Sequence, residues 1–276
     1  MVPSPKAGRI KQESNTMRIL LTNDDGIEAP GLVALEAIAA QLSDDVWVVA
    51  PAEEQSGTGH SLTLTAPIRL RQLGPKRFAV RGTPTDSVMM ALGHVMKDHR
   101  PDLLLSGVNR GPNMAEDVTY SGTVSAAMEG CLAGVRSVAL SQAMGDYTVG
   151  GEDFGPACAF GAEIVRRLGA IDWPEGVLMN VNFPVAVTAD PPVVVARQGF
   201  RDYGNIRIDA RTDPRGFPYY WFGYGREMTD PVRETDLHAV RQGAVSVTPL
   251  HLDLTHDATM AAVGKALAGS GWPVLE

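Results

Sequence analysis

Two adjacent carboxylates stand at the end of an apolar run near the start of the chain. Asp24 and Asp25 follow the run 17–23 and precede Gly26, where a buried strand is expected to end. Like charges this close repel each other, so the pair needs a compensating partner. A divalent cation is such a partner, because it draws both carboxylates toward a common centre.

Two further loops carry oxygen side chains of the kind that such a cation prefers. One follows the apolar run 45–51 and contains Ser56, and the other follows the run 101–108 and contains Asn109. Loops at the carboxyl ends of parallel strands meet at one sheet edge, where open α/β sheets bind ligands. Carboxylate, hydroxyl and amide oxygens suit Mg²⁺, Mn²⁺ or Ca²⁺, whereas the sequence offers no Cys-x-x-Cys or spaced histidine pair for zinc.

A candidate phosphate site begins the helical segment TYSGTVSAAMEG at 119–130. A helix N-terminus offers free N–H groups and partial positive charge, which suit a phosphate. An ordinary cap by Ser121 or Thr119 explains the same residues without a ligand. The Asp-Gly pair and Asn109 likewise have plainer explanations, as a turn and as a left-handed backbone position. The gathering of these loops at one sheet edge favours a metal and phosphate site.

Other reaction classes have different signatures. Neither G-x-x-x-x-G-K-[ST] nor G-x-G-x-x-G follows the first strand, so nucleoside triphosphate and dinucleotide binding are not indicated. EQSGTG is not the G-x-S-x-G elbow of serine hydrolases, although Ser56 with His60 as its base remains an alternative. A second alternative is a receiver-like module that holds Mg²⁺ and accepts a phosphoryl group. However, Ser106-Gly107 stands where the acceptor aspartate of such a module is expected.

The elements that must position these loops alternate between strands and helices. The expected strands are continuous apolar runs, typical of a parallel sheet covered on both faces. The pattern predicts a Rossmann-like, doubly wound α/β core. We expect strands at 17–23, 45–51, 78–81, 101–108 and 137–142, and helices at 30–42, 83–96, 121–134 and 154–168.

The pattern changes after about residue 176, where short strands at 177–184, 192–198 and 244–255 and a helix near 258–268 are expected. Residues 200–224 hold eight of the 17 aromatic residues, which suit a nucleobase stack or, as we favour, a subunit interface. Three units are therefore expected: a flexible tail at 1–16, an α/β catalytic core at 17–175, and a strand-rich oligomerisation arm at 176–276 whose final helix packs back on the core.

Composition and charge narrow the classes of partner. The 276 residues carry a formal net charge of −8, which disfavours binding to nucleic-acid duplexes. No window approaches 18 uninterrupted apolar residues, so no membrane span is expected, and the first 16 residues lack the apolar stretch of a secretory signal. Cys131 and Cys158 form no paired framework and are expected to be reduced thiols of a cytoplasmic protein.

In order along residues 17–255, the motifs of this chain resemble those of the SurE (survival protein E) family of metal-dependent nucleotidases. The resemblance rests on RILLTNDDGIEAPGL, VVAPAEEQSGTGHSLTL, RGTPTDSV, PDLLLSGVNRGPNMAEDVTYSGTVSAAMEG and TDLHAVRQGAVSVTPLHLDLT. It implies a Rossmann-like core with a swapped C-terminal hairpin or arm, in homodimers or tetramers. It also implies phosphate release from nucleoside 5′- and 3′-monophosphates and, in some members, from short polyphosphate.

The resemblance also assigns roles to matching residues. One divalent metal ion per subunit (Mg, Mn or Ca) would be held by Asp24, Asp25, Ser56 and Asn109. Asp24, Asp25 and Asn109 would be catalytic, with one of the two aspartates helping to take a proton from a metal-bound water. The sequence does not distinguish between the two aspartates. The phosphate neighbourhood would comprise Asn23, Gly107, Ser121, Gly122 and Thr123.

Overall fold

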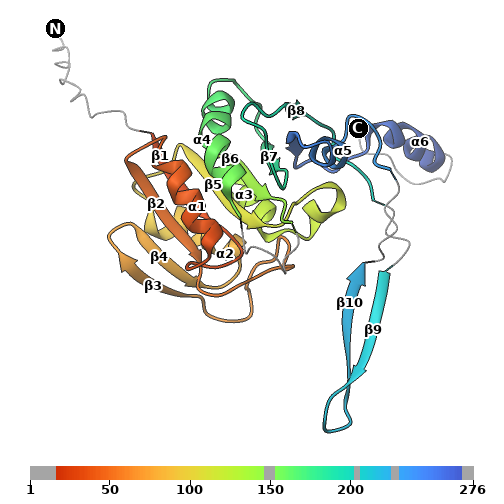
Figure 1. Ribbon diagram of the computed structural model, residues 1–276, viewed down its shortest axis with the longest axis horizontal. Helices are drawn as coiled ribbons and strands as arrows, with labels where there is room; N and C mark the ends of the chain where they lie inside the picture. Colours follow the sequence, from red (N-terminus) through yellow and green to blue (C-terminus); the bar gives the residue numbers. More distant parts are fainter. Residues whose placement is uncertain (1–16, 146–152, 202–205, 225–229, 269–276) are drawn as a thin grey trace.

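The computed structural model describes residues 17–145, 153–201, 206–224 and 230–268, so the tail expected at 1–16 lies outside the described residues. Nine of the described strands form one mixed sheet (Figure 1). In spatial order these strands are β3 (Arg69–Gly74), β4 (Arg77–Arg81), β2 (Asp45–Pro51), β1 (Arg18–Thr22), β5 (Leu103–Arg110), β6 (Arg136–Gln142), β7 (Val177–Phe183), β11 (Val245–His251) and β8 (Val193–Val195).

The central strands of this sheet are parallel. From β4 to β7 each strand pairs in parallel with its neighbours, whereas β3 is antiparallel to β4 and β11 is antiparallel to β7. The chain moves from β1 to β2 on one side and later returns to β5 on the other side of β1. The mostly parallel, doubly wound α/β fold is therefore confirmed, and its winding reverses at β1.

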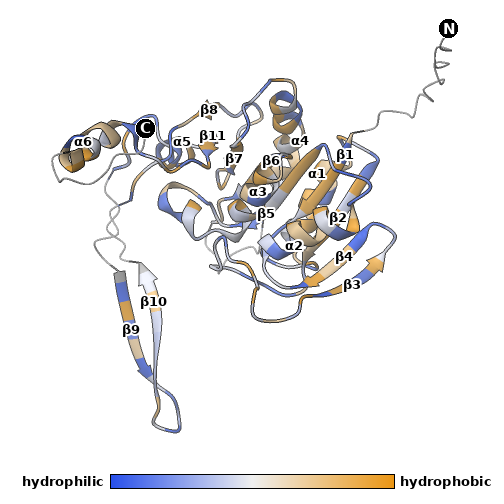
Figure 2. Ribbon diagram, turned by 180° about the vertical axis from the view of Figure 1, so that it is seen from behind, coloured by the Kyte–Doolittle hydropathy of each residue, from blue (hydrophilic) through white to orange (hydrophobic). Residues whose placement is uncertain are grey.

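Helices cover both faces of the sheet. In β1, Ile19 and Leu21 enter one apolar core and Leu20 enters the other, as the alternation of side chains along a strand requires. Figure 2 shows many apolar residues on the central strands and on the helices that cover them. The first core contains residues of α1 (Pro30–Ala39) and α4 (Gly155–Gly169), and the second contains residues of α2 (Pro84–Met90) and α3 (Gly122–Leu132).

Several boundaries differ from those expected. The apolar run that predicts a strand ending at 108 continues as β5 through Arg110, so Asn109 lies at the end of a strand rather than in a loop. Edge strand β3 is mostly exposed and polar, which is why no apolar run predicts it. The helix expected at 83–96 is α-helical only to Met90 and continues as the π-helical turn η1 (Ala91–Val95). No helix of the described residues is long and apolar enough to cross a membrane.

The C-terminal part is less separate from the core than expected. Strands β7, β11 and β8 complete the central sheet, so a boundary at 176 passes through that sheet. The hairpin of β9 (Ile206–Thr212) and β10 (Pro218–Tyr224) projects away from the body (Figure 1). The final helix, α6 (Asp257–Ala268), was expected to pack on the core but buries none of its residues. The segment after β11 carries it beyond the β8 edge of the sheet (Figures 1 and 2).

Candidate functional site

The residues expected to form the site lie at one edge of the sheet. Asp24 and Asp25 follow β1, Ser56 lies in the loop after β2, and Asn109 is near the end of β5. Because β2 and β5 flank β1 in parallel, all four residues lie at the carboxyl ends of three adjacent strands. This edge is also where the winding reverses, which is the usual position of ligand sites in such sheets.

Asp24 is buried against the N-terminus of α3. Thr123 Oγ1 donates a hydrogen bond to its Oδ1, and Gly122 is so close that a Cβ there would lie 2.6 Å from Asp24 Cβ. Burial raises the pKa of Asp24 to about 6; the hydrogen bond from Thr123 opposes this rise, and the charge of Asp25 adds to it. A nearby cation would favour the charged carboxylate instead.

Asp25 has different surroundings from its neighbour. It is less buried than Asp24, and its Oδ2 accepts a hydrogen bond from the backbone N–H of Arg110 at 3.3 Å. It lines a cavity of about 140 Å³ on the side of α1 and α4. The two carboxylates therefore lie on different sides of the site. Asp24 contacts the N-terminus of α3, and Asp25 lines the cavity. The other lining residues are Ala29, Pro30, Gly31, Glu54, Arg110 and Phe154.

Ser56 and Asn109 each offer an uncharged oxygen atom to the candidate metal site. Ser56 Oγ donates to Glu54 Oε1 at 2.9 Å, and Asn109 Nδ2 donates to the Gly111 carbonyl at 2.9 Å. In these hydrogen bonds Ser56 and Asn109 act only as donors. The lone pairs of Ser56 Oγ and Asn109 Oδ1 can therefore accept from, or bind, another partner. No three His, Cys, Asp or Glu side chains gather as a metal-binding group among the described residues, so a cation here would need these neutral ligands.

The surroundings of the aspartates fit a hard divalent cation. The donors are all oxygens, as Mg²⁺, Mn²⁺ and Ca²⁺ prefer. Asn23 is fully buried; its Nδ2 donates to the Gly26 carbonyl at 2.8 Å, while its Oδ1 has no hydrogen-bond partner among the described residues. A buried, unpaired oxygen beside two carboxylates is costly unless water or an ion meets it.

The N-terminus of α3 lies beside Asp24, as a phosphate site would require. Ser121 caps the helix by accepting a hydrogen bond from Val124 N at 3.1 Å. The backbone N–H groups of Gly122 and Thr123 begin the helix and have no acceptor within it. The structure thus brings the N-terminus of α3, with Ser121, Gly122 and Thr123, to Asp24.

Gly107 has a packing role that the sequence does not reveal. Its φ is +134°, and a Cβ there would lie 2.2 Å from the Leu140 carbonyl oxygen of β6. The pairing of β5 with β6 shifts register between Ser106 and Asn109, so Gly107 lies inside this irregularity. The close approach to β6 is sufficient to require glycine there, without a phosphate contact.

The loop that carries Ser56 is anchored along α2 and α3. Gly59 N donates to the Tyr120 carbonyl at 3.2 Å, and His60 Nε2 lies 3.0 Å from Glu129 Oε2 on α3. Ser56 binds Glu54 and His60 binds Glu129, so the described structure does not assemble the Ser–His pair of the esterase alternative.

The same loop is held to α2 by Asp86. Thr63 N donates to Asp86 Oδ1 at 3.0 Å and Thr63 Oγ1 to Oδ2 at 2.6 Å, while Thr83 N donates to Oδ2 at 2.8 Å. Thr83 Oγ1 accepts in return from Asp86 N, which completes a capping box. One buried carboxylate therefore caps the helix and fixes the loop.

Replacing Asp86 by asparagine is expected to lower the free energy of unfolding by about 1–3 kcal/mol at pH 7, because charge-assisted hydrogen bonds are lost. Burial raises the pKa of Asp86, but the hydrogen bonds from Thr63 and Thr83 outweigh burial and hold it below its ordinary 3.8. The stability that the charged Asp86 contributes is therefore present above pH 3.8, and it is lost as the pH falls through the lower pKa of the folded state. Urea unfolding across this range measures it, and a difference between the two proteins that does not shrink in acid contradicts it.

Comparisons with known proteins show the family of the chain. A family model described as "Survival protein SurE" matches residues 19–205. The chain belongs to the SurE family. It is similar to the 5'-nucleotidase SurE of Parvibaculum lavamentivorans (50% identity, 95% of each chain) and that of Rhizorhabdus wittichii (57% identity, 89% of this chain and 98% of the other). It also resembles the crystal structure of the SurE protein from Aquifex aeolicus, with a TM-score of 0.76, 39% identity, and coverage of 90% of this chain and 99% of that chain.

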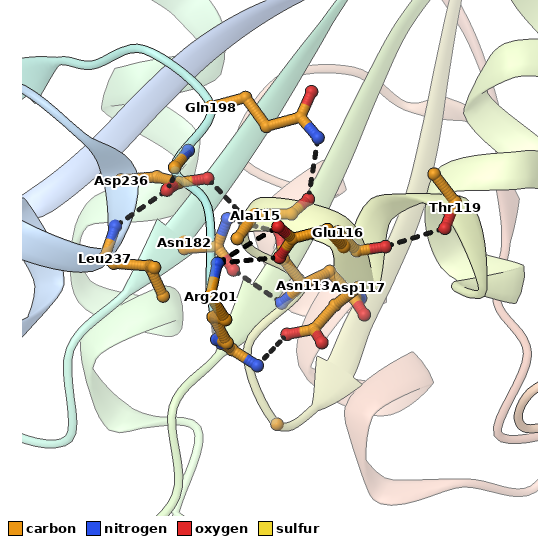
Figure 3. Close-up of polar contacts among 12 residues, drawn as sticks. Asn113, Ala115, Glu116, Asp117, Thr119, Asn182, Gln198, Arg201, Asp236 and Leu237 are labelled. Carbon is orange, nitrogen blue, oxygen red and sulfur yellow. Dashed lines mark hydrogen bonds and ion pairs between the residues drawn. The ribbon is translucent and has the colours of Figure 1, made fainter. Parts of the chain in front are cut away.

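In this SurE chain, one buried carboxylate that the sequence analysis does not predict holds the segment between β5 and α3 (Figure 3). Asp236 begins α5 (Asp236–Arg241) and accepts hydrogen bonds from Ala115 N at 2.9 Å, Gly199 N at 2.8 Å and Leu237 N at 2.7 Å. These bonds join the C-terminal part to the segment that separates Asn109 from Ser121. The motif TDLH is typical of a helix start, and Thr235 caps α5, but the motif does not indicate these distant contacts.

A second set of contacts in this SurE chain strengthens the same junction. Arg201 Nη1 lies 2.6 Å from Asp117 Oδ2, and Arg201 N donates to the Glu116 carboxylate at 3.0 Å (Figure 3). Asp117 and Glu116 belong to the 3₁₀ helix η2 (Ala115–Thr119), which leads directly to the cap of α3. The segment that leads to the N-terminus of α3 is thus held by a residue 85 positions further along the chain.

Proposed function

We propose that this SurE-family protein is a divalent-metal-dependent 5′-nucleotidase that hydrolyses nucleoside 5′-monophosphates, and also 3′-monophosphates, to nucleoside and phosphate. The observation that carries the proposal is the contact of Asp24, at the end of β1, with the N-terminus of α3. A carboxylate beside a helix N-terminus is an arrangement that suits a cation together with a phosphate. Relatives named 5'-nucleotidase SurE, at 50–57% identity, support the same activity. Short polyphosphate is a further substrate that we propose to test.

The donor set supports one divalent cation per chain, Mg²⁺, Mn²⁺ or Ca²⁺. Asp24 and Asp25 would hold it with Ser56 and Asn109, the four residues gathered at one sheet edge. When bound, the ion would polarise a phosphoryl oxygen and lower the pKa of a water molecule. The carboxylates supply negative charge, and the hydroxyl and amide supply neutral oxygens.

The protein's own groups would bind the phosphate and accept the proton. The N–H groups of Gly122 and Thr123 and the positive end of α3 suit the phosphate oxygens, and they stabilise the charge that grows there. Asp24 is 4% exposed and engaged by Thr123, whereas Asp25 lines an open cavity. Asp25 is therefore the carboxylate that we assign as the proton acceptor for the attacking water.

Chelation is expected to abolish phosphate release from AMP, and Mg²⁺ or Mn²⁺ is expected to restore it. Free phosphate is assayed over a panel of nucleoside monophosphates, tripolyphosphate and divalent metals. Repeated turnover supports the nucleotidase, whereas one phosphoryl group retained per chain would support the receiver-like module instead. Activity that persists in chelator would contradict the metal mechanism and favour a serine esterase.

We further propose that the chain forms homodimers or tetramers. Trp221 and Phe222 on the projecting hairpin are 60% and 81% exposed, and α6 buries none of its residues. Large aromatic side chains on a projecting hairpin suit a subunit interface better than solvent. Sedimentation velocity at graded concentrations measures the assembly, and a single monomeric species would contradict it.

A cytoplasmic location is also our proposal. Cys131 and Cys158 are free in the structure, and burial raises the pKa of both thiols. Unpaired, weakly reactive thiols suit a reducing compartment.

A further inference from the structure

Glu54 is a shared acceptor beside the candidate metal site. Its Oε1 accepts from Ser56 Oγ at 2.9 Å and lies 3.5 Å from Arg110 Nη2. Arg110 also donates its backbone N–H to Asp25 Oδ2 at 3.3 Å and directly follows Asn109. Glu54 and Arg110 thus connect the loop after β2 to the end of β5, and both line the cavity next to Asp25.

The direction of the hydrogen bond from Ser56 matters for metal binding. A serine hydroxyl has one hydrogen and two acceptor lone pairs. When the hydrogen points to a carboxylate, the lone pairs point elsewhere and the oxygen becomes more electron-rich. Carboxylates that orient a metal ligand in this way commonly change metal affinity 10–100-fold when removed.

Ser56 needs such an orienting partner because its own surroundings leave it free to rotate. The residue is exposed, and the next residue, Gly57, has φ of +77° and, its chain neighbours aside, no described atom within 4 Å of a Cβ position. Ordering an exposed side chain costs conformational entropy that a cation would otherwise have to offset on binding. A hydroxyl already fixed by Glu54 avoids part of that cost.

We propose that Glu54 is a positioning residue that directs Ser56 Oγ toward the cation, and that Arg110 holds Glu54 across the mouth of the Asp25 cavity. This inference rests on the proposed function, since it takes Ser56 to be a metal ligand. The side chains of Glu54 and Arg110 are 55% and 42% exposed, so water screens their interaction. We therefore expect the lower end of the usual range, about a 10-fold loss of affinity when Glu54 is removed.

The neighbouring Glu53 offers a matched control. It is also an exposed glutamate, and no described hydrogen bond joins it to Ser56. Glu53→Ala therefore removes the same charge from the same loop without removing the acceptor of the Ser56 hydroxyl. Glu54→Gln is the complementary variant, because it removes the charge and keeps an acceptor oxygen.

Calorimetric titration of the full chain with Mn²⁺ tests the proposal independently of activity. Glu54→Ala is expected to raise the Mn²⁺ dissociation constant about 10-fold, Glu54→Gln to restore most of that loss, and Glu53→Ala to change it less than 2-fold. Ser56→Ala and Ser56→Ala/Glu54→Ala are expected to bind Mn²⁺ equally, because Glu54 acts through Ser56. Thermal unfolding in chelator checks that every variant is folded.

Two results would overturn the positioning role. One is that Glu54→Ala lowers Mn²⁺ affinity by the same factor whether residue 56 is serine or alanine. The other is that Glu53→Ala lowers Mn²⁺ affinity as much as Glu54→Ala does, which would assign the effect to charge alone. Failure of the metal site itself has a different signature, since Asp25→Asn would then bind Mn²⁺ as tightly as the wild type. If Asp25→Asn loses Mn²⁺ while Glu54→Ala retains full affinity, the site stands and only the role of Glu54 fails.

Discussion

Replacing Asp25 by asparagine is expected to lower kcat for AMP hydrolysis roughly 1,000-fold in the presence of Mn²⁺. Asparagine has nearly the same shape and can still accept the hydrogen bond from the Arg110 N–H, so the fold is expected to persist. The amide, however, neither attracts a cation nor takes a proton from water at neutral pH. Steady-state phosphate release measures the loss, and thermal unfolding without metal checks the fold.

Asp44→Asn is the matched control for this experiment. Asp44 is exposed, and it precedes β2 at the opposite end of the strand from the site. The same chemical change there is expected to leave kcat within 2-fold of the wild type. Full activity of Asp25→Asn with Mg²⁺ or Mn²⁺ would falsify the assignment of Asp25.

Replacing Gly122 by alanine is expected to lower kcat/KM about 100-fold, because a shift of about 1 Å between reacting groups can cost that much. A Cβ at Gly122 would lie 2.6 Å from Asp24 Cβ and 3.0 Å from Pro84 Cγ, so the N-terminus of α3 must move away from Asp24. Overpacking of this kind also lowers the free energy of unfolding by about 1–3 kcal/mol. Kinetics and urea unfolding of the same preparation separate the two effects.

Gly130→Ala, in the same helix, is the control for the loss of stability that overpacking of α3 causes away from the site. A Cβ there would lie 2.5 Å from Ser137 Oγ and 2.6 Å from Leu104 Cδ1, away from the aspartates. This variant is expected to lose stability while its folded fraction keeps normal kcat/KM. Equal losses of activity in the two variants would show that Gly122 has no special relation to Asp24.

Much of the site could be predicted from the sequence because it depends on local features. Continuous apolar runs mark β1, β2 and β5, and the side chains that follow such runs must gather at the carboxyl edge of a parallel sheet. The type of each side chain then predicts its chemistry. Asp24, Asp25, Ser56 and Asn109 were expected at this edge on these grounds, and the structure brings them there.

The features that sequence reasoning missed depend on distant contacts. Gly107 belongs to a glycine-rich segment near the site, but only the pairing of β5 with β6 reveals the Leu140 carbonyl that occupies the space of a side chain. Asp236 lies 121 residues from Ala115, and no local pattern predicts that hydrogen bond. The strands of the hairpin β9–β10 are paired with each other rather than buried in the sheet, so no continuous apolar run predicts both of them.

The proposed function depends on a single divalent cation held by Asp24 and Asp25 together with Ser56 and Asn109. Titration of the chelator-treated chain with Mn²⁺, followed in parallel by calorimetry and by phosphate release from AMP, tests this most directly. We expect one Mn²⁺ per chain, activity that rises in proportion to occupancy, and loss of both signals in Asp25→Asn. Phosphate release by the metal-free chain, or tight Mn²⁺ binding that survives in Asp25→Asn, would contradict this role of the two aspartates.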